Sequence, residues 1–411
     1  MRPESRRARA ALWATFAVVH AGLTWLGVVV APASSVADVD LDRWWMHLAL
    51  DWGTWPVLDG PWVYPAGAIL PMLLPALGGT TSTVGYALGW CALVTALDVA
   101  ATSALLAPDQ AGSRTSPAGA WWWLAYLALL GPVAIGRLDA VVAPLMVLAL
   151  VAAVRRPAVA AALLTLGAWI KVAPGALVLP LLLAARRPLR EVVLPAAITC
   201  AIVIGVVAAG GGLAHLASFL GTQSTRGLQA EAVGATPWVL ARLWRDDVGV
   251  GLNSELITWE VFGSGTTAAA TVLDLLMALA VAAVSGALWL ARLEGRSREA
   301  LLPGALTLLV VLIAANKVGS PQLLAWLAAP IAVMLCRPGE APRRWRRAVA
   351  VTALVAAGLT QPVFPWGYAD FLAGDVAVSL TLVARNVTLV VLLGLAAAGL
   401  AGVTRGAAQE T

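Results

Sequence analysis

The stretch ADVDLDRWW, residues 37–45, follows the first long apolar run and combines carboxylates with indoles more densely than any other part of the chain. Asp51, Asp59 and Trp62 continue this composition to about residue 65. Carboxylates cost little free energy at a membrane surface and a great deal inside hydrocarbon. The stretch therefore indicates either a site that faces a lipid-borne substrate or an interfacial anchor of tryptophans with solvated acids.

The composition is that of an integral membrane protein. Of the 411 residues, 60% are hydrophobic and 12% are charged, which excludes an ordinary soluble domain. The net charge of +5 does not indicate nucleic-acid binding here. Three scattered cysteines and three distant histidines predict no disulfide framework and no metal site. We expect no cofactor.

The basic residues predict the orientation in the membrane. All 27 are arginines except Lys171 and Lys317. Most arginines lie in clusters between apolar runs, at residues 2–9, 155–156, 186–190, 292–298 and 343–347. Basic loops stay in the cytoplasm, so these clusters mark the cytoplasmic side. The first apolar run is interpreted as a retained helix because no cleavage site follows it.

The apolar runs predict an all-α polytopic protein with about twelve transmembrane helices and both termini in the cytoplasm. The expected spans are residues 10–31, 84–106, 118–135, 140–154, 157–171, 173–185, 191–210, 266–291, 300–316, 319–336, 348–361 and 378–403. We expect one domain over residues 1–411. Its first outer loop, residues 32–65, would carry short interfacial helices, and a long outer loop would occupy residues 211–265.

The segment 64–78 does not suit a straight spanning helix because it contains Pro65, Pro71 and Pro75. We expect it to be re-entrant or broken, which is allowed only where protein or water covers its backbone. The cytoplasmic turn at residues 155–156 then places Arg137 and Asp139 outside, on the same face as Asp38.

Cations are expected on the outer face, against the general trend of the chain. Five share this placement on separate helices or loops: Lys171, Lys317, Arg137, Arg226 and Arg385. Cations at the outer boundary suit an anionic headgroup such as a phosphate or phosphodiester. The alternative is that they pair with Asp139, Glu231 or Asp375, or extend to the surface.

The acids could provide general base catalysis. Sugar transfer needs a base for the acceptor hydroxyl, and a phosphate leaving group needs cations and hydrogen-bond donors. Asp38 and Asp40 would share one face in an extended segment. Their spacing could also hold a divalent cation, although solvated surface acids are the more common explanation for such a pattern.

Several short motifs occur in an order, and on a membrane side, that resemble glycosyltransferase family 87. They are Trp62-Val63-Tyr64-Pro65, Gly136-Arg137-Leu138-Asp139, Lys171-Val172-Ala173-Pro174, residues 226–231 (RGLQAE), residues 316–322 (NKVGSPQ) and Arg385-Asn386. The resemblance covers most of the chain. It implies an integral membrane enzyme of the GT-C fold class that uses polyprenyl-phosphate-linked mannose.

The resemblance also implies roles for particular residues. An aspartate early in the first outer loop would be the general base of an inverting transfer, and both Asp38 and Asp40 fit, with Asp38 slightly favoured. The donor phosphate would be held by Lys171, Lys317 and Arg226, with Arg137 and Arg385 as further candidates. The sugar or acceptor would contact Gln229, Glu231 and Gln322, together with Asp139, Trp62 and Tyr64. The departure at Tyr64-Pro65-Ala66, where many members have two prolines, concerns the shape of the loop.

Two other functions are compatible with the sequence. A transporter or flippase of an anionic lipid or lipid-linked sugar would explain charges within the membrane. It predicts more ionisable residues deep in the helices than Asp98 and Asp274, and it predicts pseudo-symmetric halves. A non-catalytic scaffold would not need outer cations on so many separate helices.

Overall fold

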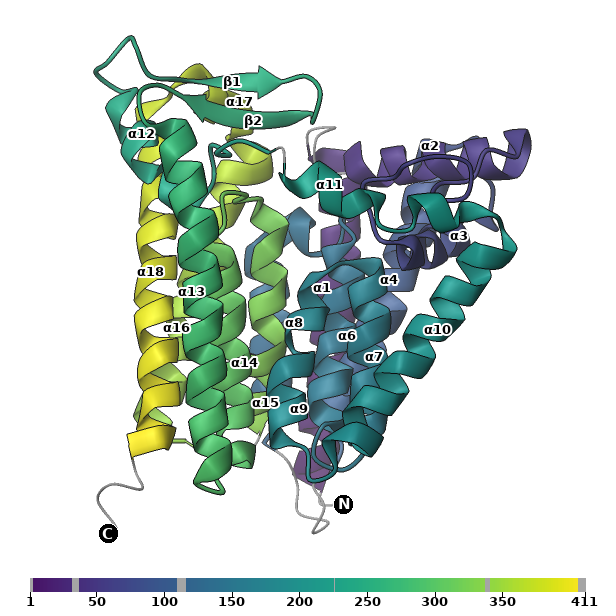
Figure 1. Ribbon diagram of the computed structural model, residues 1–411, viewed down its shortest axis with the longest axis vertical. Coiled ribbons are helices and arrows are strands. Elements are labelled where there is room, and N and C mark those ends of the chain that lie inside the picture. Colours follow the sequence, from purple (N-terminus) through teal and green to yellow (C-terminus); the bar gives the residue numbers. More distant parts are fainter. Residues whose placement is uncertain (1–2, 32–36, 109–115, 225, 337–340, 406–411) are drawn as a thin grey trace.

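Helices make up most of the computed structural model, which describes residues 3–31, 37–108, 116–224, 226–336 and 341–405 (Figure 1). Within these residues, seven helices are long and apolar enough to cross a membrane. They are Arg6–Val30, Thr83–Leu105, Leu189–Ala209, Thr266–Leu293, Ser297–Ala314, Arg343–Trp366 and Val376–Thr404. Several shorter apolar helices accompany them. The chain is therefore a polytopic membrane protein, and the expected class is confirmed.

The elements follow one another with short connections, η marking 3₁₀ or π turns. The first half contains α1 (Pro3–Trp25), η1 (Leu26–Val30), α2 (Ala37–Trp52), η3 (Ala66–Ala68), α3 (Ile69–Ala76), α4 (Thr83–Leu105), α5 (Ala118–Leu130), η4 (Gly131–Ala134), α6 (Asp139–Ala152), α7 (Pro157–Ile170), α8 (Ala173–Ala176), α9 (Val178–Ala184), η5 (Leu189–Val193) and α10 (Leu194–Ala209). The second half contains η6 (Gly212–His215), α11 (Ser218–Ser224), η7 (Val233–Ala235), α12 (Thr236–Ala241), β1 (Gly249–Asn253), β2 (Thr258–Phe262), α13 (Thr266–Leu293), α14 (Ser297–Ala314), η8 (Pro321–Leu327), α15 (Ala328–Cys336), α16 (Arg343–Gln361), η9 (Pro362–Trp366), α17 (Tyr368–Ala373) and α18 (Val376–Arg405).

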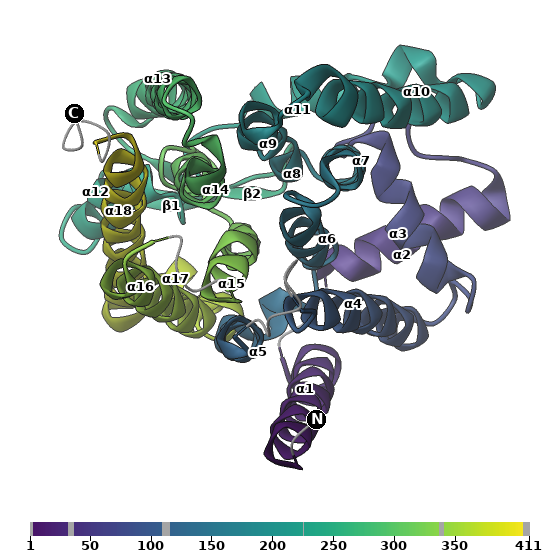
Figure 2. The same ribbon diagram turned by 90° about the horizontal axis from the view of Figure 1, so that it is seen from below.

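Burial separates interior helices from peripheral ones. The apolar window of α14 is 78% buried, whereas those of α10 and α13 are only 11% buried. On α10 the exposed side chains are apolar, as Ile198, Ile202 and Val206 show. In a membrane protein such a surface faces lipid, so α10 and α13 lie at the lipid boundary and α14 belongs to the core. Figure 2 shows α13, α14, α16 and α18 grouped on one side, α6, α7 and α10 on the other, and α1 at the edge.

Small residues allow neighbouring helices to approach closely. A Cβ atom on Gly119 of α5 would lie 2.2 Å from the main-chain oxygen of Ala332 in α15 and 2.3 Å from Sγ of Cys336. Helices in lipid gain their association energy from such close packing, because lipid tails are as apolar as the side chains. The contact therefore fixes α5 against α15 and requires glycine at this position.

The two ends of the bundle differ. Both chain termini lie at one end, here called the terminal end, while α2 lies across the opposite end, here called the α2 end (Figure 1). The α2 end also carries α11, α12, α17 and a hairpin in which β1 and β2 pair antiparallel, with Gly249 opposite Phe262 and Asn253 opposite Thr258. Most of the polar side chains of interest lie at this end.

Two local expectations need refinement. The long outer loop expected at residues 211–265 contains the short helices α11 and α12 and the β-hairpin, which holds the only two strands among the described residues. The segment 64–78 contains η3 and α3, and α3 has only eight residues. At 1.5 Å per residue, α3 is about 12 Å long, well below the roughly 30 Å of a hydrocarbon core.

Candidate functional site

Helix α2 separates the aspartates that the sequence groups together. The extended conformation considered for Asp38 and Asp40 is wrong, because residues Ala37–Trp52 form a helix whose buried face includes Val39 and Met46. Residues four apart share a helix face, so Asp38 lies with Asp42. Asp40 instead accepts hydrogen bonds from Arg43 Nε at 2.7 Å and Thr83 Oγ1 at 2.8 Å.

This arrangement does not favour a cation held jointly by Asp38 and Asp40. Asp40 is engaged with its own arginine, and the Arg43 hydrogen bond lowers the pKa of the Asp40 carboxyl. Asp38 forms an ion pair with Arg137, from the segment before α6. The two carboxylates therefore have different partners on different sides of α2.

Arg137 connects α2 to the core of the bundle. It is only 8% exposed, and its guanidinium lies over the ring of Phe364 at 5.4 Å from the centroid. Its main-chain oxygen accepts a hydrogen bond from the Ala140 N–H at 2.9 Å, where α6 begins. The ion pair with Asp38 thus joins an acid of α2 to a cation at the start of a buried helix.

A second ion pair lies beside the first. Lys171 Nζ is 3.4 Å from Oδ2 of Asp139, the first residue of α6. The indole N–H of Trp326 donates to Oδ1 of Asp139 at 2.6 Å. Asp139 is 1% exposed, while the Lys171 side chain is 22% exposed. The lysine is therefore the accessible member of the pair, and Trp326 holds the buried carboxylate in place.

Aromatic side chains from residues 45–64 pack beside these charges. The Lys171 ammonium lies over the ring of Tyr64 at 5.1 Å. Tyr64, Trp62 and Trp45 pack edge to face, with centroids 5.4–5.9 Å apart. Within the described residues, the buried indole N–H of Trp62 has no hydrogen-bond partner. Burial raises the pKa of the Tyr64 hydroxyl, and the nearby Asp38 raises it further, so Tyr64 stays neutral.

Asp42 is the site residue that sequence reasoning missed. Its side chain is 2% exposed, and burial raises its pKa well above the usual value. Asp38 raises it further, whereas Lys171 and Arg137 act in the opposite direction. The four-residue spacing from Asp38 was the available signal. The two acids of one helix face thus differ in environment, and such differences assign different roles to paired carboxylates.

A second polar group, here called the Glu231 cluster, contains Glu231, Tyr368, Arg385 and Asn386. The Arg385 guanidinium donates to the main-chain oxygen of Glu231. The Asn386 amide donates to Ala232 O at 3.3 Å and to Thr236 Oγ1 at 2.9 Å. The Tyr368 hydroxyl lies 3.4 Å from Oε2 of Glu231. These contacts attach the 226–236 segment to α18.

Burial shifts the pKa of the Glu231 carboxyl toward neutral pH. Glu231 is 3% exposed, and burial raises the pKa of its carboxyl to about 7, against the lowering effect of Arg385. Its Oε1 atom and Nη1 of Arg385 are buried and have no hydrogen-bond partner among the described residues. Phe364 connects the Glu231 cluster to the first cluster of charges, which contains Asp38, Arg137, Asp139 and Lys171. Its ring packs against Tyr368 at 5.1 Å between centroids and lies under the Arg137 guanidinium.

Gln229 forms a contact between the loop that carries it and the loop at residues 316–322. Gln229 accepts hydrogen bonds from the Gly319 N–H at 2.8 Å and from Ser320 Oγ at 3.2 Å. The main-chain N–H of Gln229 donates to the main-chain oxygen of Lys317 at 2.9 Å. A Cβ atom on Gly319 would lie 2.1 Å from Ala232 N, so this contact requires glycine. The 316–322 motif thereby supports the 226–231 motif.

Three further residues expected to contact the donor or the acceptor, Lys317, Arg226 and Gln322, have other surroundings. Lys317 Nζ pairs with Asp274 of α13 at 3.0 Å, and so has a carboxylate partner separate from that of Lys171. Arg226 is half-buried, and its Nε atom has no hydrogen-bond partner within the described chain. Gln322 is half-buried in η8.

The arrangement combines an accessible carboxylate, two nearby cations and neutral aromatic groups at one end of a membrane bundle. No curated protein and no solved structure matches the chain. The model of glycosyltransferase family 87 matches residues 62–321, more than half of the chain. The match includes Arg137, Asp139 and Lys171 and begins after Asp38. The chain belongs to glycosyltransferase family 87.

Proposed function

We propose that the protein transfers a sugar, mannose, from a polyprenyl-phosphate donor to a lipid or glycan acceptor, with inversion at the anomeric carbon. One observation carries this proposal. Asp38 of α2 pairs with Arg137 before α6, Lys171 after α7 pairs with Asp139, and the charges of Asp38, Arg137 and Lys171 all act on the buried Asp42 between them in the first cluster of charges. A glycosyl transfer from a lipid phosphate needs such a base beside such cations.

Asp38 is the proposed general base. Its side chain is 36% exposed, whereas Asp42 is buried and Asp40 is engaged with Arg43. In the reaction, Asp38 accepts the proton of the acceptor hydroxyl while that oxygen bonds to the anomeric carbon. The bond from the anomeric carbon to the phosphate oxygen breaks, and its electron pair leaves with the polyprenyl phosphate.

Arg137 and Lys171 are the proposed principal contacts of the donor phosphate. Arg137 is already desolvated, and both cations are held by carboxylates, which reduces the reorganisation needed when charge develops on the leaving oxygen. A planar guanidinium matches two phosphate oxygens, and an ammonium serves as a point charge. Binding of the phosphate by Arg137 would also free the Asp38 carboxylate for the acceptor. Lys317, Arg226 and Arg385 are proposed as outer contacts of the same phosphate.

The sugar and acceptor would lie between the two clusters. Trp62 and Tyr64 offer aromatic surfaces, and Nε1 of Trp62 and Oε1 of Glu231, which have no partner in the part of the chain that the structure describes, offer hydrogen-bonding groups. Asp139, Gln229 and Gln322 complete the proposed set. In this scheme Asp139 acts by holding Lys171, and Gln229 acts by holding the 316–322 loop.

The proposed topology has about twelve crossings in a GT-C arrangement, with both termini cytoplasmic and the site extracytoplasmic, in the cell (plasma or inner) membrane. Two features support it. Both termini lie at one end of the bundle (Figure 1), and the arginine-rich starts of α14 and α16 follow helices that run toward that end. The positive-inside rule assigns that end to the cytoplasm.

The transporter alternative receives less support. It needs ionisable groups free to bind cargo inside the helices. Asp98 of α4 is buried and pairs with His20 of α1 at 2.9 Å, and Asp274 pairs with Lys317. Both acids therefore have partners within the fold.

A transfer assay tests the proposal. Purified protein in lipid nanodiscs would be given polyprenyl-phosphate-mannose and a panel of glycolipid acceptors, and product formation would be followed by mass spectrometry. We expect a mannosylated lipid and free polyprenyl phosphate in equal amounts. Translocation of the donor across proteoliposomes without any transfer, at the same protein concentration, would contradict the proposal and favour the transporter.

A further inference from the structure

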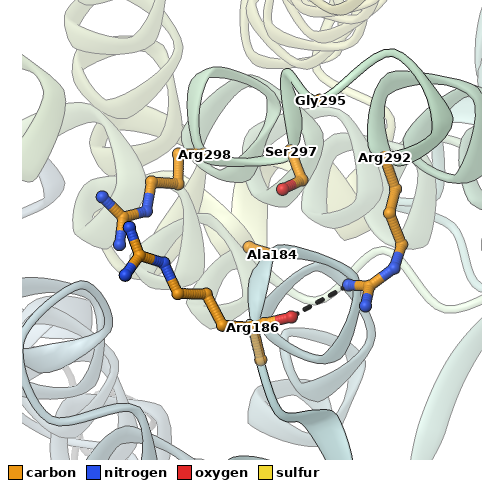
Figure 3. Close-up of a pocket in the computed structure, with 7 residues that line it drawn as sticks. Ala184, Arg186, Arg292, Gly295, Ser297 and Arg298 are labelled. Carbon is orange, nitrogen blue, oxygen red and sulfur yellow. Dashed lines mark hydrogen bonds between the residues drawn. The ribbon is translucent and has the colours of Figure 1, made fainter.

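A second group of basic residues lies at the terminal end, opposite the α2 end of the bundle. A pocket of about 380 Å³ lies where the end of α9 meets the turn between α13 and α14. Figure 3 shows Arg186, Arg292 and Arg298 around it, together with Ala184, Gly295 and Ser297. A neighbouring pocket of about 210 Å³ shares Arg186 and Arg298 with the first.

One arginine of this pocket has a structural role. Arg292 donates through Nη1 to the main-chain oxygens of Leu183 at 2.5 Å and Ala185 at 3.0 Å. These carbonyls belong to the last turn of α9, where helix carbonyls otherwise lack partners. Arg292 therefore joins α13 to α9 and forms one wall of the pocket.

The other two arginines have no such engagement. Within the described residues, no hydrogen bond or ion pair involves the side chain of Arg186 or Arg298, and Figure 3 shows both guanidinium groups extending to the same side of the pocket. The nearby acids have other partners: Glu299 pairs with Arg296 at 3.0 Å, and Glu191 accepts the Arg187 N–H at 3.1 Å. The first pocket is lined by three arginines and no acid, and the neighbouring one by Arg155, Arg186, Arg298 and the single acid Glu191. This excess of positive charge favours an anion.

The surroundings add two features that suit a phosphate group. Helix α14 begins at the pocket, and its N-cap residue Arg296 makes no side-chain cap hydrogen bond. A helix N-terminus carries a partial positive charge and free N–H groups, which favour phosphate. The neighbouring pocket is lined by Leu181 and Leu301, which offer apolar contact beside the charges.

We propose that Arg186 and Arg298 bind a phosphate group at the terminal end, as a site separate from the one at the α2 end. The phosphate belongs to an anionic lipid headgroup or to a soluble phosphate compound. Guanidinium groups bind phosphate oxygens in pairs, and basic pockets between transmembrane helices bind anionic headgroups. This proposal does not depend on the transfer reaction.

Ligand-dependent thermal unfolding tests the site. Purified full-length protein in neutral detergent would be titrated with phosphatidylglycerol, with phosphatidylcholine and with sodium pyrophosphate, and unfolding would be followed by tryptophan fluorescence. The test variant is Arg186→Gln/Arg298→Gln. The matched control is Arg343→Gln/Arg344→Gln, which removes the same charge from exposed positions at the start of α16, outside the pocket. Native mass spectrometry of the single variants would count bound phosphatidylglycerol independently.

The expected result is a rise in Tm with phosphatidylglycerol that phosphatidylcholine does not give. The apparent Kd should increase at least about tenfold in the test variant and stay near the wild-type value in the control. A matching response to pyrophosphate would identify a soluble phosphate as a ligand, and a response to the lipid alone would identify a headgroup. Absence of any saturable response, or equal losses in the test and control variants, would overturn the proposal.

Discussion

The Asp38 carboxylate of α2 forms an ion pair with the Arg137 guanidinium, which precedes α6. Arg137 is buried and stacks on Phe364, so the acid is held by a cation with little freedom to move. Lys171 and Asp139 form the adjacent pair. The base and the phosphate contacts proposed here thus come from separate elements, and they meet only when the bundle has assembled.

Arg137→Gln tests the cation closest to the proposed base. The change removes a charge-assisted contact to the donor phosphate, and it leaves Asp38 without its partner. We expect kcat/KM for transfer to fall by about tenfold to a hundredfold, corresponding to the value of a hydrogen bond to a charged group. Arg43→Gln is the control, because Arg43 pairs with Asp40 instead. Equal losses in both variants would contradict the assigned role.

Lys171→Met and Lys317→Met should lower kcat/KM for transfer by different amounts. Lys171 is proposed to contact the phosphate, while Lys317 is paired with Asp274. We expect at least about a tenfold larger loss of kcat/KM in Lys171→Met, since removal of a leaving-group contact acts on the transition state. Trp326→Phe, which removes the donor to Asp139, should raise the KM for the donor while Lys171 remains present. Steady-state kinetics with varied donor concentration would measure these effects.

The Glu231 carboxyl should make stability depend on pH. Its pKa is raised from 4.5 to about 7 in the folded state. The folded protein therefore binds more protons than the unfolded chain between these values, and this group's contribution to stability falls as pH rises through that window. We expect the Tm of Glu231→Gln to fall less than the Tm of the wild type when the pH rises from 5 to 8. The exposed Glu255→Gln is the control, and indistinguishable profiles of all three proteins would contradict the assignment.

Gly319→Ala should disrupt the loop contact. The added Cβ would overlap the main chain of Ala232, which cannot turn aside as a side chain can. Overpacking of this kind costs about 1–3 kcal/mol. We therefore expect a lower Tm and reduced transfer. Gly286→Ala in α13 is the control, because nothing lies within 4 Å of its Cβ position. An unchanged Tm in Gly319→Ala would show that the loop can separate from the 226–232 segment.

The sequence was sufficient for the membrane class and for the approximate positions of most helices. The runs expected at 84–106, 266–291 and 378–403 agree with α4, α13 and α18 within a few residues. Apolar length and charge determine these features locally, which is why they could be predicted. The family was also recognised correctly from the order of its short motifs.

The partners of the charged residues could not be predicted in the same way. The bond from Trp326 to Asp139 joins positions far apart in sequence, and nothing local to either residue indicates it. The pairing of Lys317 with Asp274 and the attachment of Arg385 to the Glu231 main chain also depend on how helices pack. The helical conformation of residues 37–52 moved Asp40 away from Asp38, which the alternation of acids with apolar residues did not indicate.

The most direct test compares Asp38→Asn with Asp40→Asn in single-turnover transfer from polyprenyl-phosphate-mannose. Both variants remove one negative charge from α2, and only Asp38 is paired with Arg137. We predict that Asp38→Asn lowers the transfer rate by about 10²- to 10⁴-fold, the usual contribution of a general base, while Asp40→Asn stays near wild type. A wild-type rate in Asp38→Asn, or the larger loss in Asp40→Asn, would contradict the account.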